Sequence, residues 1–142
     1  MKKIILIVSC LIFSSAIYAE KIKEVNVPNA VKDKLQAMFQ SAKNIKWVKE
    51  FGNFEAEFDK NGNEISVLFA PDGQWLQTEN AIKLNELPNA VMIYVEKKLA
   101  NKKIKESAKV VDAKNNVSFE IEVDGEEYLF DNKGNFLRKQ KS

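Results

Sequence analysis

The sequence predicts an α+β fold: a two-layer sandwich formed by a tandem repeat of two units, each with one helix and an antiparallel meander of strands. Three observations support this prediction. Similar blocks recur in the same order roughly sixty residues apart. Each block begins with apolar residues at helical spacing, and alternating strands separated by glycine turns follow. The 142 residues suffice for one domain made of two such units.

The first nineteen residues have the pattern of a secretory signal peptide. Lys2 and Lys3 give a positive start, an apolar stretch follows, and Ala19 is a small residue at a suitable cleavage point. Cleavage after Ala16 is the alternative site, and an uncleaved membrane anchor is the alternative role of the segment. Cys10 lies inside the apolar stretch rather than at its end, so we expect no lipidation. We therefore expect a periplasmic or secreted protein with no stable membrane span after cleavage near Ala19.

The residue counts exclude several classes of function. The chain has no His and one Cys, so Ser-His-Asp and Cys-His catalytic machinery, His-ligated metals and Cys-rich zinc sites are excluded. Loss of Lys2 and Lys3 with the leader leaves 20 basic against 20 acidic residues. A nucleic-acid-binding domain would show a basic excess, so we expect no nucleic-acid partner. We also expect no enzymatic activity, no catalytic residue, no metal and no cofactor.

Recurring blocks divide residues 20–142, a single predicted domain, into two repeats at about 25–84 and 85–142. The linker over residues 80–86 has neither Gly nor Pro, so we expect the repeats to form one cooperative unit rather than two tethered ones. The recurring blocks are Pro28–Val31 with Pro88–Val91, Phe54–Phe58 with Phe119–Val123, and Val67–Leu76 with Tyr128–Leu137.

Each repeat begins with a predicted helix that carries one apolar stripe. Pro28 and Pro88 suit the first turn of these helices, with the asparagine that follows each proline as an alternative cap. A stripe of this kind must be buried, so we expect both helices to cover one face of a sheet. The stripe residues are Val31, Leu35, Met38 and Phe39 in the first repeat, and Val91, Val95 and Leu99, with Tyr94 beside them, in the second.

The strands that follow each helix alternate with period two. Phe54, Ala56 and Phe58 point one way, whereas Glu55 and Glu57 point the other, and residues 119–123 repeat this alternation. Asn-Gly or Asp-Gly dipeptides at 61–62, 72–73 and 124–125 predict tight hairpins, because both turn positions favour a positive φ. The pattern indicates half-buried antiparallel strands.

Other patterns admit a structural and a functional interpretation. Glu55 with Glu57, and Glu120 with Glu122, could act in acid–base catalysis, but charge is also favoured at exposed strand positions, and we prefer that interpretation. Residues 59–64 resemble a calcium loop superficially and fit a hairpin turn better. We expect both tryptophans, at positions 47 and 75, to be core residues, with a recognition surface as the alternative.

Taken together, these motifs resemble the PepSY-like proteins, a β-lactamase-inhibitor-like group of periplasmic proteins. The resemblance implies a tandem of two inhibitor-like α+β halves, export, no known catalysis, and a partner protein held by the domain, sometimes on the open sheet face. The chain departs from the pattern at Ala70, where Asp is more usual, as at Asp131. The resemblance covers Val27–Val31, Phe39, Ile45–Glu50, Phe54–Phe58 and Val67–Leu76, and then Leu87 to Leu137.

We expect the sheet face that the helices leave free to bind an unidentified protein or peptide of the cell envelope. Exposed Leu68 and Leu129 among acidic residues would suit a modest interface. The leading hypothesis is an exported, non-catalytic protein- or peptide-binding module, with inhibition of an envelope enzyme as one form of it. A small-ligand or cation-binding periplasmic protein is the alternative, followed by a carboxylate-based hydrolase. The residues predicted to face the partner are Glu55, Glu57, Ser66, Leu68, Glu120, Glu122 and Leu129.

Overall fold

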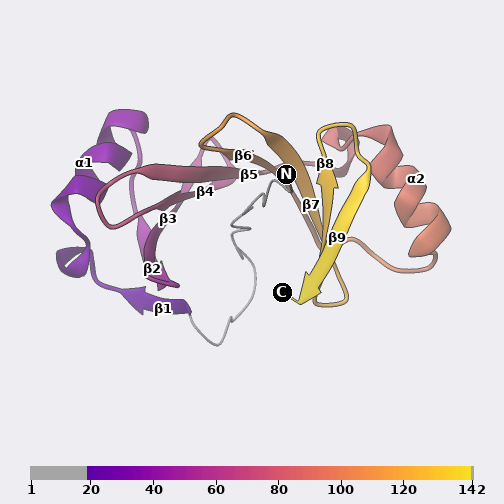
Figure 1. The fold of residues 1–142 in the computed structure, drawn as a ribbon, viewed down its shortest axis with the longest axis horizontal. Helices are drawn as coiled ribbons and strands as arrows, with labels where there is room; N and C mark the ends of the chain where they lie inside the picture. Colours follow the sequence, from indigo (N-terminus) through magenta and orange to yellow (C-terminus); the bar gives the residue numbers. More distant parts are fainter. Residues whose placement is uncertain (1–18, 142) are drawn as a thin grey trace, which may run out of the picture.

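The computed structural model describes residues 19–141, which form one antiparallel sheet of nine strands with two helices (Figure 1). The predicted signal peptide lies outside these residues, except for Ala19, which begins the first strand. Neither helix of the described part has the length and apolar composition that a membrane span needs.

The strands follow chain order across the sheet, and each is antiparallel to the next. The two helices lie at opposite ends of the sheet (Figure 1). In order, the elements are β1 (Ala19–Ile22), the 3-10 helix η1 (Glu24–Asn26), α1 (Asn29–Met38), β2 (Lys46–Glu50), β3 (Asn53–Lys60), β4 (Asn63–Phe69), β5 (Trp75–Ala81), η2 (Leu84–Glu86), α2 (Asn89–Lys98), β6 (Glu106–Asp112), β7 (Val117–Val123), β8 (Glu126–Asp131) and β9 (Phe136–Lys141).

The predicted fold class is wrong. We expected a two-layer sandwich built from a tandem repeat of helix-plus-meander units, whereas the structure is a single nine-stranded sheet that carries only two ten-residue helices. Strand β5 pairs with β6 from Gln77–Asp112 to Ala81–Ala108, across the border that the sequence placed between repeats. This pairing satisfies backbone groups that separate units would leave at open edges.

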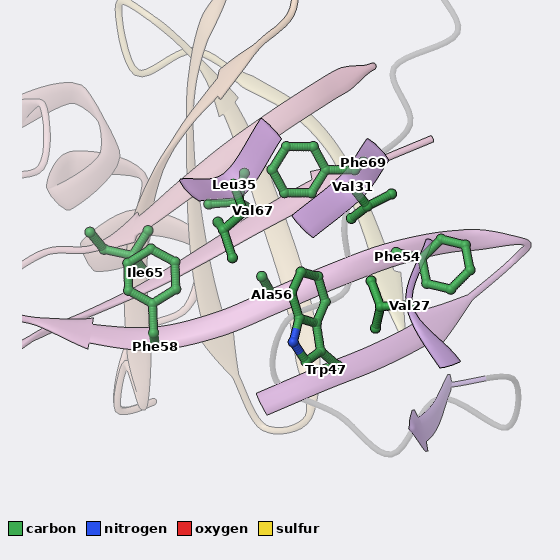
Figure 2. Packing of buried hydrophobic residues seen from close by; sticks show 10 residues of the cluster. All are labelled: Val27, Val31, Leu35, Trp47, Phe54, Ala56, Phe58, Ile65, Val67 and Phe69. Carbon is green, nitrogen blue, oxygen red and sulfur yellow. The ribbon is translucent and has the colours of Figure 1, made fainter. Parts of the chain in front are cut away.

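One hydrophobic cluster joins α1 to strands β2–β4 (Figure 2). Val31 and Leu35 of the predicted stripe are buried, whereas Met38 and Phe39 are half-buried against the cluster. Pro28 immediately precedes α1 instead of lying in its first turn. The buried members are Val27, Val31, Leu35, Trp47, Phe54, Ala56, Phe58, Ile65, Val67 and Phe69.

Both tryptophans contribute to this cluster, which confirms the core interpretation. Trp47 is buried within it. Trp75 packs against it and donates a hydrogen bond from Nε1 to Thr78 Oγ1 at 2.9 Å. Trp47 is therefore a core residue, and Trp75 is a half-buried residue at the border of the core.

A second cluster joins α2 to strands β7 and β8. Val91 and Leu99 are buried there, and Tyr94 stacks on Phe136 with a centroid separation of 4.9 Å. The stripe predicted for this helix is therefore confirmed, although Val95 is only half-buried. The buried members are Leu87, Val91, Leu99, Phe119, Ile121, Val123, Tyr128 and Phe130.

The tight hairpins predicted at 61–62 and 124–125 are present, whereas the turn at 72–73 is part of a five-residue connection in which only Gly73 of the pair has a positive φ. That connection also packs against a helix. Asn61 and Gly62 both have positive φ between β3 and β4, and Asp59 Oδ1 accepts a hydrogen bond from the Gly62 N–H at 3.0 Å. This geometry confirms a hairpin instead of a calcium loop at residues 59–64. Gly73, at φ +86°, lies so close to α1 that a Cβ atom there would be 2.6 Å from the carbonyl oxygen of Ala30. Gly73 therefore permits the turn after β4 to pack directly against the start of the helix.

Candidate functional site

The sheet face opposite the two described helices carries most of the acidic residues of the strands. Directly paired residues in an antiparallel sheet point to the same face, so the register identifies its members. Ser66 lies opposite both Glu57 and Glu79, and Ala108 lies opposite Glu120. We call this surface the glutamate face; its acidic residues include Glu50, Glu55, Glu57, Glu79, Glu106, Glu120, Glu122 and Glu127.

All seven residues predicted from the sequence lie on the glutamate face, but six of them are buried. Leu68 is 3% exposed and Leu129 is 2% exposed, so the prediction that these leucines are exposed is wrong. Glu57 alone is half-buried. The buried predicted residues are Glu55, Ser66, Leu68, Glu120, Glu122 and Leu129.

Curvature of the sheet explains why a face without a covering layer is buried. Glu50 lies on β2 and Glu127 on β8, six strands apart in the sheet order. The charge of Glu50 nevertheless acts on Glu127. Burial is the largest cause that raises the pKa of Glu127, and the charges of Glu122 and Glu50 raise it further. The hydrogen bond from Gln140 lowers this pKa. The sheet arches between its two ends (Figure 1), which brings β2 and β8 within electrostatic reach of each other on its concave side.

Several carboxylates of the face have hydrogen-bond donors. Ser66 Oγ donates to Glu55 Oε1. Gln140 Nε2 donates to Glu127 Oε2 at 2.8 Å. Lys105 Nζ lies 3.1 Å from Glu122 Oε1 in an ion pair. These contacts offset part of the cost of burying the charges.

Glu79 is the most strongly perturbed group of the face. It is 3% exposed, and its Oε2 atom has no hydrogen-bond partner in the part of the chain that the structure describes. Burial raises the pKa of Glu79 well above its ordinary value, and the nearby carboxylates of Glu120, Glu55, Glu127 and Glu106 raise it further. Any cation brought to this point would relieve the repulsion.

Sequence reasoning missed the centre of the face, which is formed by Glu79, Glu106 and Glu127. Glu79 pairs with Val110, and both Glu106 and Glu127 pair with Glu122. These residues could therefore be assigned to a face only once the strand pairing was known. The alternation of Gln77, Thr78 and Glu79 was the available signal. It does not distinguish the concave face from the helix-covered face, because β5 carries buried polar residues on both.

Two adjoining cavities open at this centre. The smaller has a volume of about 10 Å³, roughly the space of one water molecule. The larger, about 460 Å³, shares Glu106 and Ser107 with it. The smaller is lined by Glu79, Glu106, Ser107, Ala108, Glu120, Ile121, Glu122 and Glu127; the larger, by Glu64, Ala81, Ile82, Lys83, Leu84, Ile104, Lys105, Glu106 and Ser107.

A further cavity of about 400 Å³ borders Glu57 and Glu64 near the start of β2. Burial, followed by the charge of Glu64, raises the pKa of Glu57, whereas Lys46 and Lys21 lower it. Within residues 19–141, no group of three or more acidic side chains converges closely enough to hold a metal ion. The carboxylates are therefore spread over the face instead of forming a chelating site.

A family model described as "Putative beta-lactamase-inhibitor-like, PepSY-like" matches residues 48–138, which confirms the resemblance predicted from the motifs. A structure from Bacteroides eggerthii DSM 20697, described as a putative periplasmic protein, is 26% identical with a TM-score of 0.73; the match covers 81% of this chain and 88% of that one. A BLIP-like protein from Bacteroides fragilis NCTC 9343 is 25% identical with a TM-score of 0.65, covering 80% and 86%.

A DUF2874 family protein from Bacteroides uniformis ATCC 8492 is 21% identical with a TM-score of 0.72, and the match covers 80% of this chain and 88% of that one. At this identity the likeness shows the fold alone. No curated protein matches the chain.

Proposed function

Because this chain belongs to the PepSY-like, β-lactamase-inhibitor-like family, we propose that it is an exported, non-catalytic module that binds a protein or peptide on the glutamate face. The observation that carries the proposal is the set of buried glutamates on a sheet face that neither helix of residues 19–141 covers. Glu79, at its centre, has a buried oxygen without a partner among the described residues.

The energetics of the two sheet faces support a binding role. Burial of like charges near one another opposes folding, since each carboxylate loses hydration and repels its neighbours. The two hydrophobic clusters lie on the other face, so the fold does not depend on the glutamates for its core. Residues that oppose stability without serving the core are characteristic of functional surfaces.

The cavity geometry argues against hydrolysis at the centre of the glutamate face. Pockets for small substrates usually measure about 300–1,000 Å³. The cavity shared by Glu79, Glu120 and Glu127 measures only about 10 Å³. Glu55, one of the two residues considered for a hydrolase, is buried and accepts a hydrogen bond from Ser66. Glu55 therefore does not face a substrate-sized space, whereas Glu57 borders the separate cavity of about 400 Å³.

Inhibition of an envelope enzyme is the specific form of binding that the comparisons suggest. The B. fragilis relative is described as BLIP-like, and the matching family carries the same inhibitor-like description. The concave face would then cover part of a target protein. Exported enzymes are therefore the first partners to screen.

Export is supported by the predicted signal peptide and by the periplasmic description of the B. eggerthii relative. Intact-mass measurement of the exported protein should give a chain that begins at Glu20, with Ile17 as the first residue if cleavage follows Ala16 instead. A chain that retains Met1 in the native cells would contradict the proposed processing.

Site-specific photo-cross-linking tests the binding role. A cross-linking residue replaces Glu57, which is half-buried on the glutamate face, and in a matched variant it replaces Glu96, which is exposed on α2. We expect protein or peptide adducts in native cells from position 57 and not from position 96. Absence of adducts at 57, or the same adducts from both positions, would contradict the proposal.

A further inference from the structure

Glu79 lies within electrostatic reach of carboxylates from four other strands of the glutamate face. It comes from β5, and the residues that act on it electrostatically come from β3, β6, β7 and β8: Glu55, Glu106, Glu120 and Glu127. Its Oε2 atom is buried and has no hydrogen-bond partner within residues 19–141. The small cavity lined by Glu79 is the place where a ligand could reach this oxygen.

We infer that the partner of this face presents a lysine side chain whose ammonium group enters the small cavity beside Glu79. This inference rests on the proposed function, because it identifies the chemistry of the residue that anchors the partner. The ammonium would meet the carboxylates of Glu79, Glu120 and Glu127, which line the cavity. It would supply hydrogen-bond donors to acceptors that are already desolvated.

The local charge favours a further cation. Five glutamates line the small cavity, and the ammonium of Lys105 pairs with one of them, Glu122, at 3.1 Å. Lys105 is 62% exposed and approaches from solvent. Burial raises the pKa of Glu127 and the charge of Arg138 lowers it, so basic side chains of the protein neutralise the five glutamates only in part. The same pair shows that a lysine ammonium is compatible with carboxylates on this face.

The geometry distinguishes lysine from other cations. The structure shows no convergent set of three or more acidic ligands among residues 19–141, so a metal ion lacks the coordination that it needs. A volume of about 10 Å³ suits an ammonium, which is a compact point charge. The guanidinium of arginine is a broad planar fork and needs more space.

The neighbouring large cavity offers a surface for the rest of the side chain. Glu106 and Ser107 line both cavities. Its lining includes Ala81, Ile82 and Ile104, against which the four-carbon stem of a lysine can pack. Burial of the stem with pairing of the head would make one lysine an anchor of the interface.

Matched peptides test this inference on the full mature chain. The probe is an acetylated Gly-Ser peptide with three lysines, and the comparison peptides carry arginine or N-acetyl-lysine at the same positions. Isothermal titration calorimetry at low salt measures each affinity. We expect the lysine peptide to bind at least about tenfold more tightly than either comparison peptide, a difference of about 1.4 kcal/mol.

Three variants connect the binding to the cavity. Glu79→Gln and Glu120→Gln should each weaken binding of the lysine peptide about tenfold, and Glu96→Gln, an exposed change on α2, should leave it unchanged. Melting curves confirm that each variant is folded. Two variants of the cavity keep the test decisive if one of them fails to fold.

The inference is overturned if the arginine or acetyl-lysine peptide binds as tightly as the lysine peptide, or if both cavity variants bind like the wild type. It is also overturned if millimolar calcium raises the melting temperature while the lysine peptide does not bind. In these cases, adducts from position 57 would still support the proposed function, so the two failures are distinguishable.

Discussion

The two faces of the sheet are buried to a similar degree by opposite chemistry. On β4, Val67 and Phe69 are fully buried beneath α1, whereas their neighbours Ser66 and Leu68 are 3% exposed on the glutamate face. Burial on the helix-covered face removes apolar surface from water and stabilises the fold. Burial on the glutamate face brings carboxylates together and opposes it. Similar exposure values therefore conceal different roles.

This difference indicates how the molecule divides its tasks. The helix-covered face supplies the core, and the glutamate face supplies unsatisfied charge at a fixed position. Because one sheet forms both faces, a rigid core holds the charges in place. Mutations on the two faces should therefore differ in size and in sign.

The largest effect is expected for Phe69→Ala on the helix-covered face. Phe69 is fully buried in the α1 cluster, so its removal leaves a cavity and should cost about 3–5 kcal/mol of unfolding free energy. Leu68→Ala is the matched change on the other face. It should cost about 2 kcal/mol, because water can enter a face that has no covering layer. Urea denaturation measures both, and equal losses would break the comparison.

The contact between Gly73 and the start of α1 should give the next largest loss of stability on mutation. In Gly73→Ala, the new Cβ would lie 2.6 Å from the carbonyl oxygen of Ala30 at φ +86°. Steric clash and backbone strain together should cost about 3 kcal/mol. Gly62→Ala has a similar φ, but its Cβ meets nothing within 4 Å, so backbone strain alone should cost about 1 kcal/mol. Similar losses of unfolding free energy in the two variants would show that the contact between Gly73 and α1 does not contribute to stability.

Loss of a hydroxyl should also distinguish the faces. In Ser66→Ala, the buried Glu55 carboxylate loses the donor at Ser66 Oγ, which should cost about 2 kcal/mol because the bond involves a charged group. On the helix-covered face, Thr78→Val removes the acceptor for Trp75 Nε1. This neutral bond is worth about 1 kcal/mol. Equal costs would argue that Glu55 is uncharged in the folded protein.

The sequence predicted the elements well and their assembly poorly. Helical spacing located Val31, Leu35 and Val91, and glycine turns located the hairpins, because both are properties of short segments. The pairing of β5 with β6 depends on residues separated by a whole helix. The recurring blocks therefore predicted a two-layer tandem of helix-plus-meander repeats, whereas the structure is a single nine-stranded sheet.

The candidate site shows the same limit. Alternation placed Glu55 and Glu120 on the correct face, but the prediction that Leu68 and Leu129 are exposed was wrong. Burial of these leucines results from curvature across many strands, and no local pattern reports it. Glu79 was missed for the same reason: its importance comes from neighbours on four other strands.

The pH dependence of stability tests the glutamate face as a whole. Burial is the first cause that raises the pKa of Glu79, Glu127 and Glu106, so the folded state binds these protons more tightly than the unfolded state. Their contribution to stability is fully present below about pH 4.5, the ordinary pKa of a glutamate. It is lost as the pH rises through the pKa values of these groups in the folded state. The hydrogen bond from Asn135 lowers the pKa of Asp131, whose contribution is lost as pH falls below its ordinary 3.8. The melting temperature should therefore rise from pH 7 towards about pH 4.5 and fall below it.

Glu79→Gln should give the smallest change, and a change of opposite sign. At pH 7 the variant removes a carboxylate that folding forces among others, while it keeps the size of the side chain. We expect stabilisation of about 1 kcal/mol, or about 3 °C in melting temperature, together with a shallower rise between pH 7 and 4.5. Glu96→Gln on α2 should change neither quantity. If Glu79→Gln lowers the melting temperature at pH 7, the carboxylate stabilises the fold, and the division of tasks between the two faces is refuted.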